Sequence, residues 1–68
     1  MSQAEKIRSF LLNNPGVYSP RLLVEAMTLK GFKNISRQAA SRGLVEAEAN
    51  GWATRIRRGL YRVRGRPR

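Results

Sequence analysis

The chain has 68 residues, with 14 lysines and arginines against four acidic residues, which gives a formal net charge of +10. A chain this short has room for one small domain, and such a charge favours nucleic acid or another anionic surface as the partner. The sequence contains no cysteine and no histidine, which excludes disulfides, thiolate metal ligands and histidine-dependent catalysis.

The first predicted element is a helix that opens at Ser2. Ser2 is followed three residues later by Glu5, and this spacing forms a capping box. Residues 13–16 read Asn-Asn-Pro-Gly and should end the helix, after which residues 17–18 can form a short extended segment. The apolar stripe of this helix is predicted to comprise Ala4, Ile7, Phe10 and Leu11.

Two further helices are predicted, each opened by a serine. Ser19 caps the second helix with Pro20 at its first position, and Gly31 ends it in a left-handed conformation. Ser36 caps the third helix, which closes at residues 50–51. The buried stripe of the third helix is predicted to be Ala40, Leu44 and Ala47.

The last predicted element is a β-hairpin from Trp52 to Arg64 that turns at Arg58-Gly59. A two-residue turn would pair Arg57 with Leu60, Ile56 with Tyr61, Arg55 with Arg62, Thr54 with Val63 and Ala53 with Arg64. Alternation would then place Trp52, Thr54, Ile56, Tyr61 and Val63 on one face, and Arg55, Arg57, Arg62 and Arg64 on the other with Ala53 and Leu60. Because like charges across a ladder repel, this face favours a polyanionic partner, although a merely solvated basic face fits the same pattern.

Charge is concentrated in the same C-terminal segment. Residues 1–51 carry seven basic and four acidic residues, a net +3, whereas residues 52–68 carry seven basic residues and no acid, a net +7. This asymmetry indicates a binding end rather than a general contribution to solubility.

The second and third helices together predict a helix-turn-helix, in which the second of the two helices enters the DNA major groove. With Ala40 and Leu44 turned inward, we expect base readout by Arg37, Gln38, Ser41 and Arg42. A solvated helix face would carry similar residues. Contacts to the DNA backbone are expected from the hairpin and from the helix ends, through Arg55, Arg57, Arg58, Arg62, Arg64, Lys30, Lys33 and Ser36.

Over residues 4–63 the chain resembles a winged helix-turn-helix domain. The resemblance lies in the order of the elements, in the Ser-Arg-Gln-Ala-Ala-Ser-Arg opening of the third helix and in the final Arg-Arg-Gly-Leu-Tyr-Arg-Val segment. That segment is similar to the wing of the N-terminal domains of abortive-infection-type antitoxins and of small plasmid and phage repressors. The resemblance implies an α+β fold of three helices and a C-terminal hairpin wing, with the third helix in the major groove and the wing arginines on phosphates or in the minor groove.

Such antitoxins continue into a second domain, whereas the present sequence has only a short tail after the hairpin. We therefore expect an autonomous repressor or a DNA-binding accessory protein. The expected domain spans residues 1–64, with residues 65–68 as a flexible basic tail. Residues 64–67 resemble the Arg-Gly-Arg-Pro core of an AT-hook, which implies that Arg66 and Arg68 contact the minor groove. Composition alone can also produce this match in so arginine-rich a segment.

A single small module reads few base pairs, so we expect a homodimer on an inverted repeat. Leu12, Val24 and Val45 lie off the main apolar stripes and are candidate dimer contacts, or single exposed apolar residues. The N-terminus lacks a signal-peptide pattern and no apolar stretch approaches the ~20 residues of a membrane span, so we expect a cytoplasmic, nucleoid-associated protein.

Other functions remain open or are disfavoured by the sequence. With four scattered glutamates and no Asp, His or Cys, we expect no enzyme, no metal and no cofactor. Trp52 and Tyr61 could stack on single-stranded bases, but packing of the hairpin onto the helices explains them better. The rival hypotheses are a non-specific architectural DNA-binding protein, an RNA-binding protein, and a module whose basic face binds an acidic protein.

Overall fold

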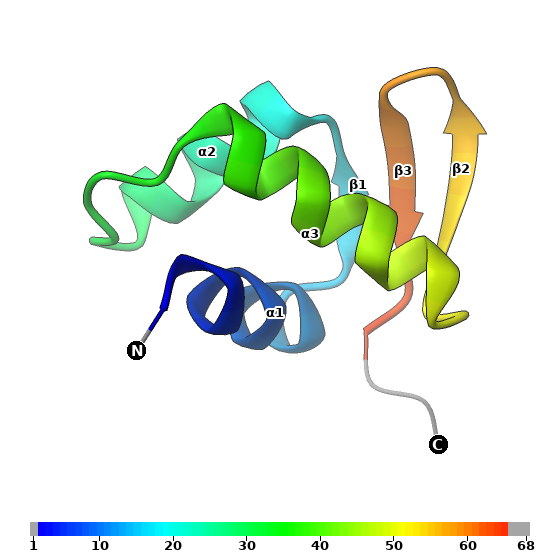
Figure 1. Ribbon diagram of the computed structural model, residues 1–68, viewed down its shortest axis with the longest axis horizontal. Coiled ribbons are helices and arrows are strands. Elements are labelled where there is room, and N and C mark those ends of the chain that lie inside the picture. The colour runs from blue at the N-terminus through cyan, green and yellow to red at the C-terminus, as the bar shows by residue number, and fades with distance from the viewer. Residues whose placement is uncertain (1, 66–68) are drawn as a thin grey trace.

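The computed structural model describes residues 2–65. In this part of the chain, three helices and a three-stranded antiparallel sheet form an α+β fold, as expected from the sequence (Figure 1). The elements in chain order are α1 (Gln3–Asn13), β1 (Gly16–Tyr18), α2 (Pro20–Leu29), α3 (Arg37–Ala49), β2 (Ala53–Arg57) and β3 (Leu60–Val63). None of the helices found within residues 2–65 has the length and hydrophobicity needed to cross a membrane.

Each helix begins at the serine that the sequence predicted. The hydroxyl oxygens of Ser2, Ser19 and Ser36 accept hydrogen bonds from the backbone N–H three residues later, at 3.3, 3.1 and 3.1 Å. These bonds satisfy N–H groups that have no partner inside the helix. Residue Gly31, predicted to end α2, has a φ of 97°, in the left-handed region that glycine favours.

The core lies between the three helices and the inner face of the sheet. It consists of Ile7, Phe10, Leu11, Leu23, Met27, Ile35, Ala40, Leu44, Ala47, Ala53, Tyr61 and Val63. The predicted α3 stripe is thus confirmed in full. The α1 stripe is confirmed except for Ala4, which lies in the first turn of α1 and is exposed.

Helices α1 and α3 pack closely at a glycine. A Cβ placed on Gly43 would come within 2.4 Å of the Cγ2 atom of Ile7, and the Ile7 side chain is fully buried. A residue with a side chain at this crossing would therefore force the Ile7 side chain or one of the two helices to shift. The close approach fixes the orientation of α3, and so determines which of its residues face outward.

The sheet differs from the predicted hairpin in two ways. First, β1 pairs with β3, so the strand order is β1-β3-β2 and the extended segment at residues 16–18 becomes an edge strand. Second, only the predicted Arg57–Leu60 pair is correct. The observed partners are Arg55 with Tyr61, Thr54 with Arg62, and Ala53 with Val63, because the register shifts by one residue between Arg55 and Arg57.

The shift has a physical reason in the core pattern. A regular ladder from the Arg58-Gly59 turn would have paired Thr54 with buried Val63 and left Ala53 opposite Arg64. An irregularity at Ile56 instead aligns Ala53 with Val63, and both side chains are buried, at 4% and 2% exposure. Two residues predicted to face the core, Thr54 and Ile56, are therefore exposed.

The predicted grouping of the arginines on one face is also wrong. Arg55 pairs with Tyr61, which in turn pairs with Tyr18 of β1, so Arg55 belongs to the row that continues the inner face of the sheet. Arg57 and Arg62 lie in rows of the opposite face. The side chains of these three residues are nevertheless exposed, as is that of Arg64.

Candidate nucleic-acid interface

The first two turns of α3 present an exposed polar and basic surface. Because Ala40, Leu44 and Ala47 point into the core, helical spacing turns Gln38 and Arg42 to the opposite side. Arg37, Gln38 and Arg42 are exposed and Ser41 is half-buried. The structure therefore brings the four predicted base-reading residues together on the N-terminal part of one helix, where their side chains can reach another molecule.

Ser36 and Gln3 fix the position at which α3 begins. The Ser36 hydroxyl accepts from the backbone N–H of Ala39, and the Ser36 backbone N–H donates to the side-chain oxygen of Gln3 at 3.3 Å. The amide nitrogen of the same Gln3 side chain donates to the carbonyl oxygen of Asn34 at 2.9 Å. The first turn of α3 is thus tied to α1, and a phosphate contact by Ser36 stays a prediction.

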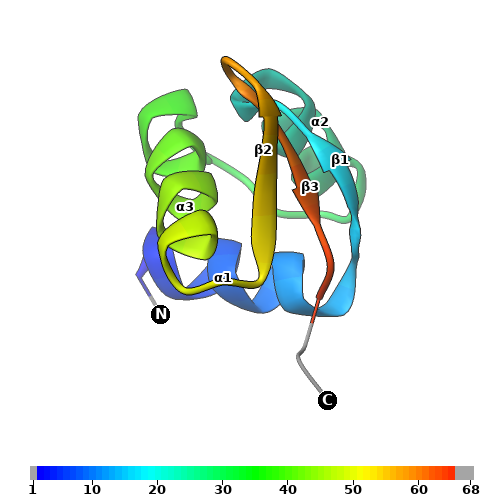
Figure 2. The same cartoon turned by 90° about the vertical axis from the view of Figure 1, so that its right-hand side faces the viewer.

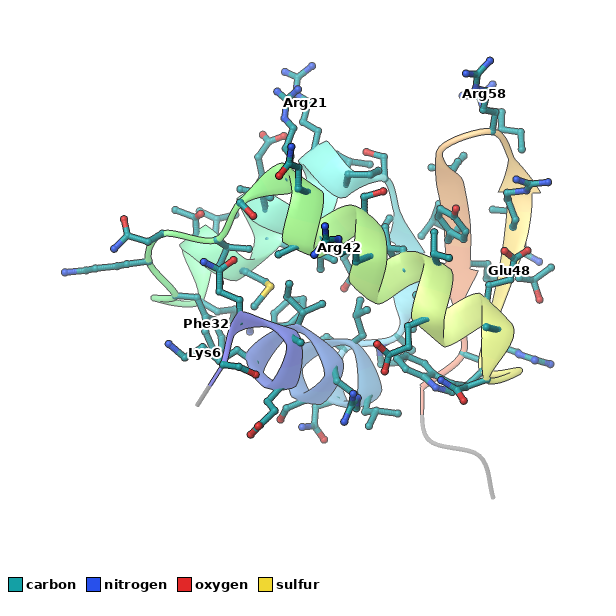
Figure 3. All side chains as sticks on the ribbon, in the orientation of Figure 1. Lys6, Arg21, Phe32, Arg42, Glu48 and Arg58 are labelled. Atoms are coloured by element: carbon teal, nitrogen blue, oxygen red, sulfur yellow. The ribbon has the colours of Figure 1, made fainter. Side chains whose placement is uncertain are left out.

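The hairpin turn lies at the same end of the molecule as the start of α3. In both Figure 1 and Figure 2 this end is at the top, and Figure 2 shows the turn leaning toward the side formed by α3. Arg57 ends β2 and Arg58 occupies the turn, and both are exposed. In Figure 3 the Arg58 side chain projects outward from the turn. Gly59 closes the turn with a φ of 76°, a conformation that residues with side chains rarely adopt.

The remaining predicted hairpin contacts are spread along the ribbon. Arg62 lies in the middle of β3, paired with Thr54 on one side and Val17 on the other. Arg64 follows β3 at the end opposite the turn (Figure 1), where its backbone N–H bonds the Trp52 carbonyl at 3.0 Å. Its guanidinium donates to the carbonyl oxygen of Gly51. Arg64 is therefore not part of the surface formed by the hairpin turn and α3.

The other predicted backbone contacts lie elsewhere. Lys30 follows the last residue of α2 and Lys33 lies in the α2–α3 connection, and both are exposed. That connection is on the side of α3 away from the hairpin (Figure 1). Arg66 and Arg68, predicted to contact the minor groove, lie outside the described residues. Gly65, assigned from the sequence to the tail, is buried, so packing extends one residue beyond the expected domain.

Sequence reasoning missed one cation at the upper end, Arg21. It is the second residue of α2, is exposed, and projects in Figure 3 from the same end of the molecule as Arg58. Its only ion pair among the described residues is with Glu25, at 3.5 Å between exposed side chains, which is a weak interaction. The position could have been found, because Ser19-Pro20 already marked the start of α2, where exposed backbone N–H groups also favour anions.

Two of the acidic residues, Glu46 and Glu48, lie toward the other end of α3, whereas Glu25 pairs with Arg21 of the upper end. Glu46 is held 2.7 Å from the Arg8 guanidinium of α1, and Glu48 projects between α3 and β2 in Figure 3. Arg42 lies on the near side of α3 in that view and also lines a groove of about 210 Å³ between α1 and α3, together with Arg8, Glu46 and Trp52. The end formed by the hairpin turn and the starts of α2 and α3 thus carries several exposed arginines, with Glu25 as the acidic neighbour of Arg21.

The aromatic residues do not form a stacking platform. Tyr61 is only 7% exposed, and Trp52 is partly buried against the core, so the packing interpretation is confirmed for both. We refer below to the surface formed by Arg21, Arg37, Gln38, Ser41, Arg42, Arg57 and Arg58 as the upper surface.

Comparison with protein-family models, with curated proteins and with solved structures gave no significant match. The functional interpretation therefore depends on the residues and geometry of this chain.

Proposed function

We propose that the protein is a winged helix-turn-helix protein that binds double-stranded DNA at specific sequences, most simply as a transcriptional repressor that blocks a promoter. In this proposal α2 and α3 form the helix-turn-helix, and the hairpin of β2 and β3 is the wing. The observation that carries the proposal is the upper surface: the exposed opening turns of α3 share one end of the molecule with the wing turn.

The chemistry of α3 suits the edges of base pairs in the major groove. Arginine can donate two hydrogen bonds to O6 and N7 of guanine, and glutamine can bond N6 and N7 of adenine. Arg37, Gln38, Ser41 and Arg42 provide these groups from one exposed helix end, and α3 is held at its start by Ser36 and at its middle by the Gly43 crossing. A rigidly positioned helix favours a defined base sequence.

The wing and the start of α2 supply charge rather than sequence information. Arg57 and Arg58 at the wing turn, and Arg21 at the start of α2, are exposed and would contact phosphates on either side of the groove that α3 enters. Their contacts would fix the position of the protein on the duplex. Arg55, Arg62, Lys30 and Lys33 would add longer-range attraction.

We further propose that the protein acts as a homodimer on an inverted repeat and is associated with the nucleoid. One copy presents about two turns of recognition helix, which can read only a few base pairs, so two copies are needed for a unique site.

Selection of binding sites from a random duplex pool tests the proposal. We expect one enriched motif, bound with two copies of the protein and at least ~10³-fold more tightly than random duplex at the same salt concentration. A ratio near one with tight, salt-sensitive binding would replace the proposal with an architectural function. Preference for a structured RNA over every duplex would replace it with RNA binding.

A further inference from the structure

The proposed readout leaves one exposed residue of α3 unexplained, Val45. Its side chain is 50% exposed, although the adjacent Leu44 is fully buried. Valine is a weak helix former, so a solvated position in a helix is better filled by alanine, glutamate or lysine. An exposed valine in the middle of α3 is thus neither required by the core nor favoured by the helix, and its position relative to the proposed base-reading residues distinguishes it from the other exposed apolar residues.

Val45 lies on the same face of α3 as the proposed base-reading residues. Gln38, Ser41, Arg42 and Val45 have the spacing i, i+3, i+4 and i+7, so they form one continuous stripe opposite Ala40, Leu44 and Ala47. From Gln38 to Val45 the helix advances about 10 Å. This is about three steps of B-DNA, so the stripe has the length needed to meet successive base pairs.

Charge shows where this stripe ends. Below Val45 the helix carries Glu46, paired with Arg8 at 2.7 Å, and Glu48, which projects between α3 and β2 (Figure 3). Carboxylates would be repelled by DNA phosphates, so the DNA-facing part of α3 cannot extend far past Val45. Within residues 38–45 of this stripe, Val45 is therefore the last residue and the only apolar side chain, because Ala49, the next position at helical spacing, lies beyond both glutamates.

We propose that Val45 contacts the 5-methyl group of a thymine, and that it is a specificity-determining residue of the DNA site. The inference rests on the proposed function, since it requires α3 to lie in the major groove. The thymine methyl is the one apolar group that base pairs expose in that groove, and small apolar side chains recognise it by contact. The Val45 side chain is branched, apolar and half-exposed at the end of the polar stripe, so it can make van der Waals contact with this methyl group.

The test uses duplexes carrying the selected motif, in which each thymine in turn is replaced by deoxyuridine. This replacement removes the methyl group and preserves base pairing. For the unmodified protein we expect one thymine per half-site at which the loss weakens binding about fourfold, which corresponds to burial of one methyl group, ~0.8 kcal/mol. For Val45→Ala, whose side chain is two methyl groups smaller, the same replacement should have a much smaller effect, and both proteins should bind the uracil duplex equally well.

Two variants serve as controls. Val45→Ile keeps an apolar branched side chain and should retain the dependence on the methyl group. Leu29→Ala changes another exposed apolar residue, 87% exposed at the end of α2, and should leave the deoxyuridine pattern unaltered. Thermal unfolding of each variant establishes that α3 remains folded.

The outcomes separate this inference from the proposed function. If a motif is selected but no thymine methyl affects binding, or if Val45→Ala keeps the methyl dependence, the assignment of Val45 is wrong while sequence-specific binding stands. If Val45→Ala lowers the number of copies bound without changing the methyl dependence, Val45 is a dimer contact and the inference is overturned. If no motif is enriched over random duplex, the proposed function and the inference both fail.

Discussion

Replacing Arg58 by alanine should weaken binding to every duplex to a similar extent and make binding less sensitive to salt. Arg58 lies in the wing turn, is exposed, and makes no described hydrogen bond or ion pair, so its removal should change the free energy of unfolding by less than ~0.5 kcal/mol. Its expected function is contact with one phosphate. The effect should therefore be seen in the salt dependence and not in the choice of sequence.

The magnitude follows from the cations of the upper surface. Each phosphate contact contributes about 0.9 to the slope of log K against log salt concentration. If Arg21, Arg57 and Arg58 each contact one phosphate, a fourfold rise in salt lowers the affinity of one domain roughly 40-fold. Without Arg58 the same rise should lower it only about 12-fold. Fluorescence anisotropy with a labelled duplex over a series of salt concentrations measures both slopes.

Arg64→Ala is the matched control. It removes the same chemical group from the same hairpin, but from the end opposite the wing turn, where the guanidinium is bonded to the Gly51 carbonyl. We expect its slope to equal that of the unmodified protein. A reduction in slope for Arg64→Ala as large as that for Arg58→Ala would refute the proposed orientation of the hairpin on DNA.

Three further predictions concern recognition and stability. Arg42→Ala should relax the preference for one base pair of the selected motif by about 1–3 kcal/mol, measured as the ratio of affinities for the motif and its single-site variants; an unchanged ratio would remove Arg42 from base readout. Gly43→Ala should destabilise the fold by about 1–2 kcal/mol in urea unfolding, because overpacking against Ile7 outweighs the improved helix propensity. Adding Ile7→Leu, which removes the Cγ2 atom, to Gly43→Ala should reduce this loss of stability. Burial raises the pKa of the Tyr18 phenol, whose hydroxyl donates a hydrogen bond to the Asn14 carbonyl at 2.8 Å. The raised pKa means that the neutral phenol stabilises the fold. This stabilisation is complete below the ordinary tyrosine pKa and declines as the pH rises through the higher folded-state pKa. Tyr18→Phe should therefore lose less stability than the unmodified protein between neutral and strongly alkaline pH, and equal losses would contradict the assignment.

The sequence predicted the helices well because their signals are local. A serine cap, a glycine after the helix and apolar residues at helical spacing act within one or two turns, so Ser36 and the stripe of Ala40, Leu44 and Ala47 could be identified without tertiary structure. The Arg58-Gly59 turn was found for the same reason. Arg21 has an equally local signal, because it directly follows the Ser19-Pro20 start of α2.

The hairpin register could not be read from the turn alone. The turn favoured a regular ladder, whereas burial of Ala53 opposite Val63 required one extra residue on β2, and the core requirement prevailed at Ile56. The pairing of β1 with β3 also depends on contacts between residues more than 40 positions apart, such as Gly16 with Val63. Local patterns carry no information about such contacts. The distribution of arginines over the two faces was mispredicted because of the extra residue at Ile56, which moves Arg55 to the other face.

The central claim is that DNA binds the end of the molecule where the wing turn and the starts of α2 and α3 meet. Amide chemical shifts recorded by NMR during titration with the selected duplex test it most directly. The account predicts the largest changes at residues 20–22, at residues 36–45 and at the wing turn, residues 57–59, with little change in the middle of α1 or at residues 62–65. Changes concentrated on α1 and the base of the hairpin, with the wing turn unaffected, would contradict it.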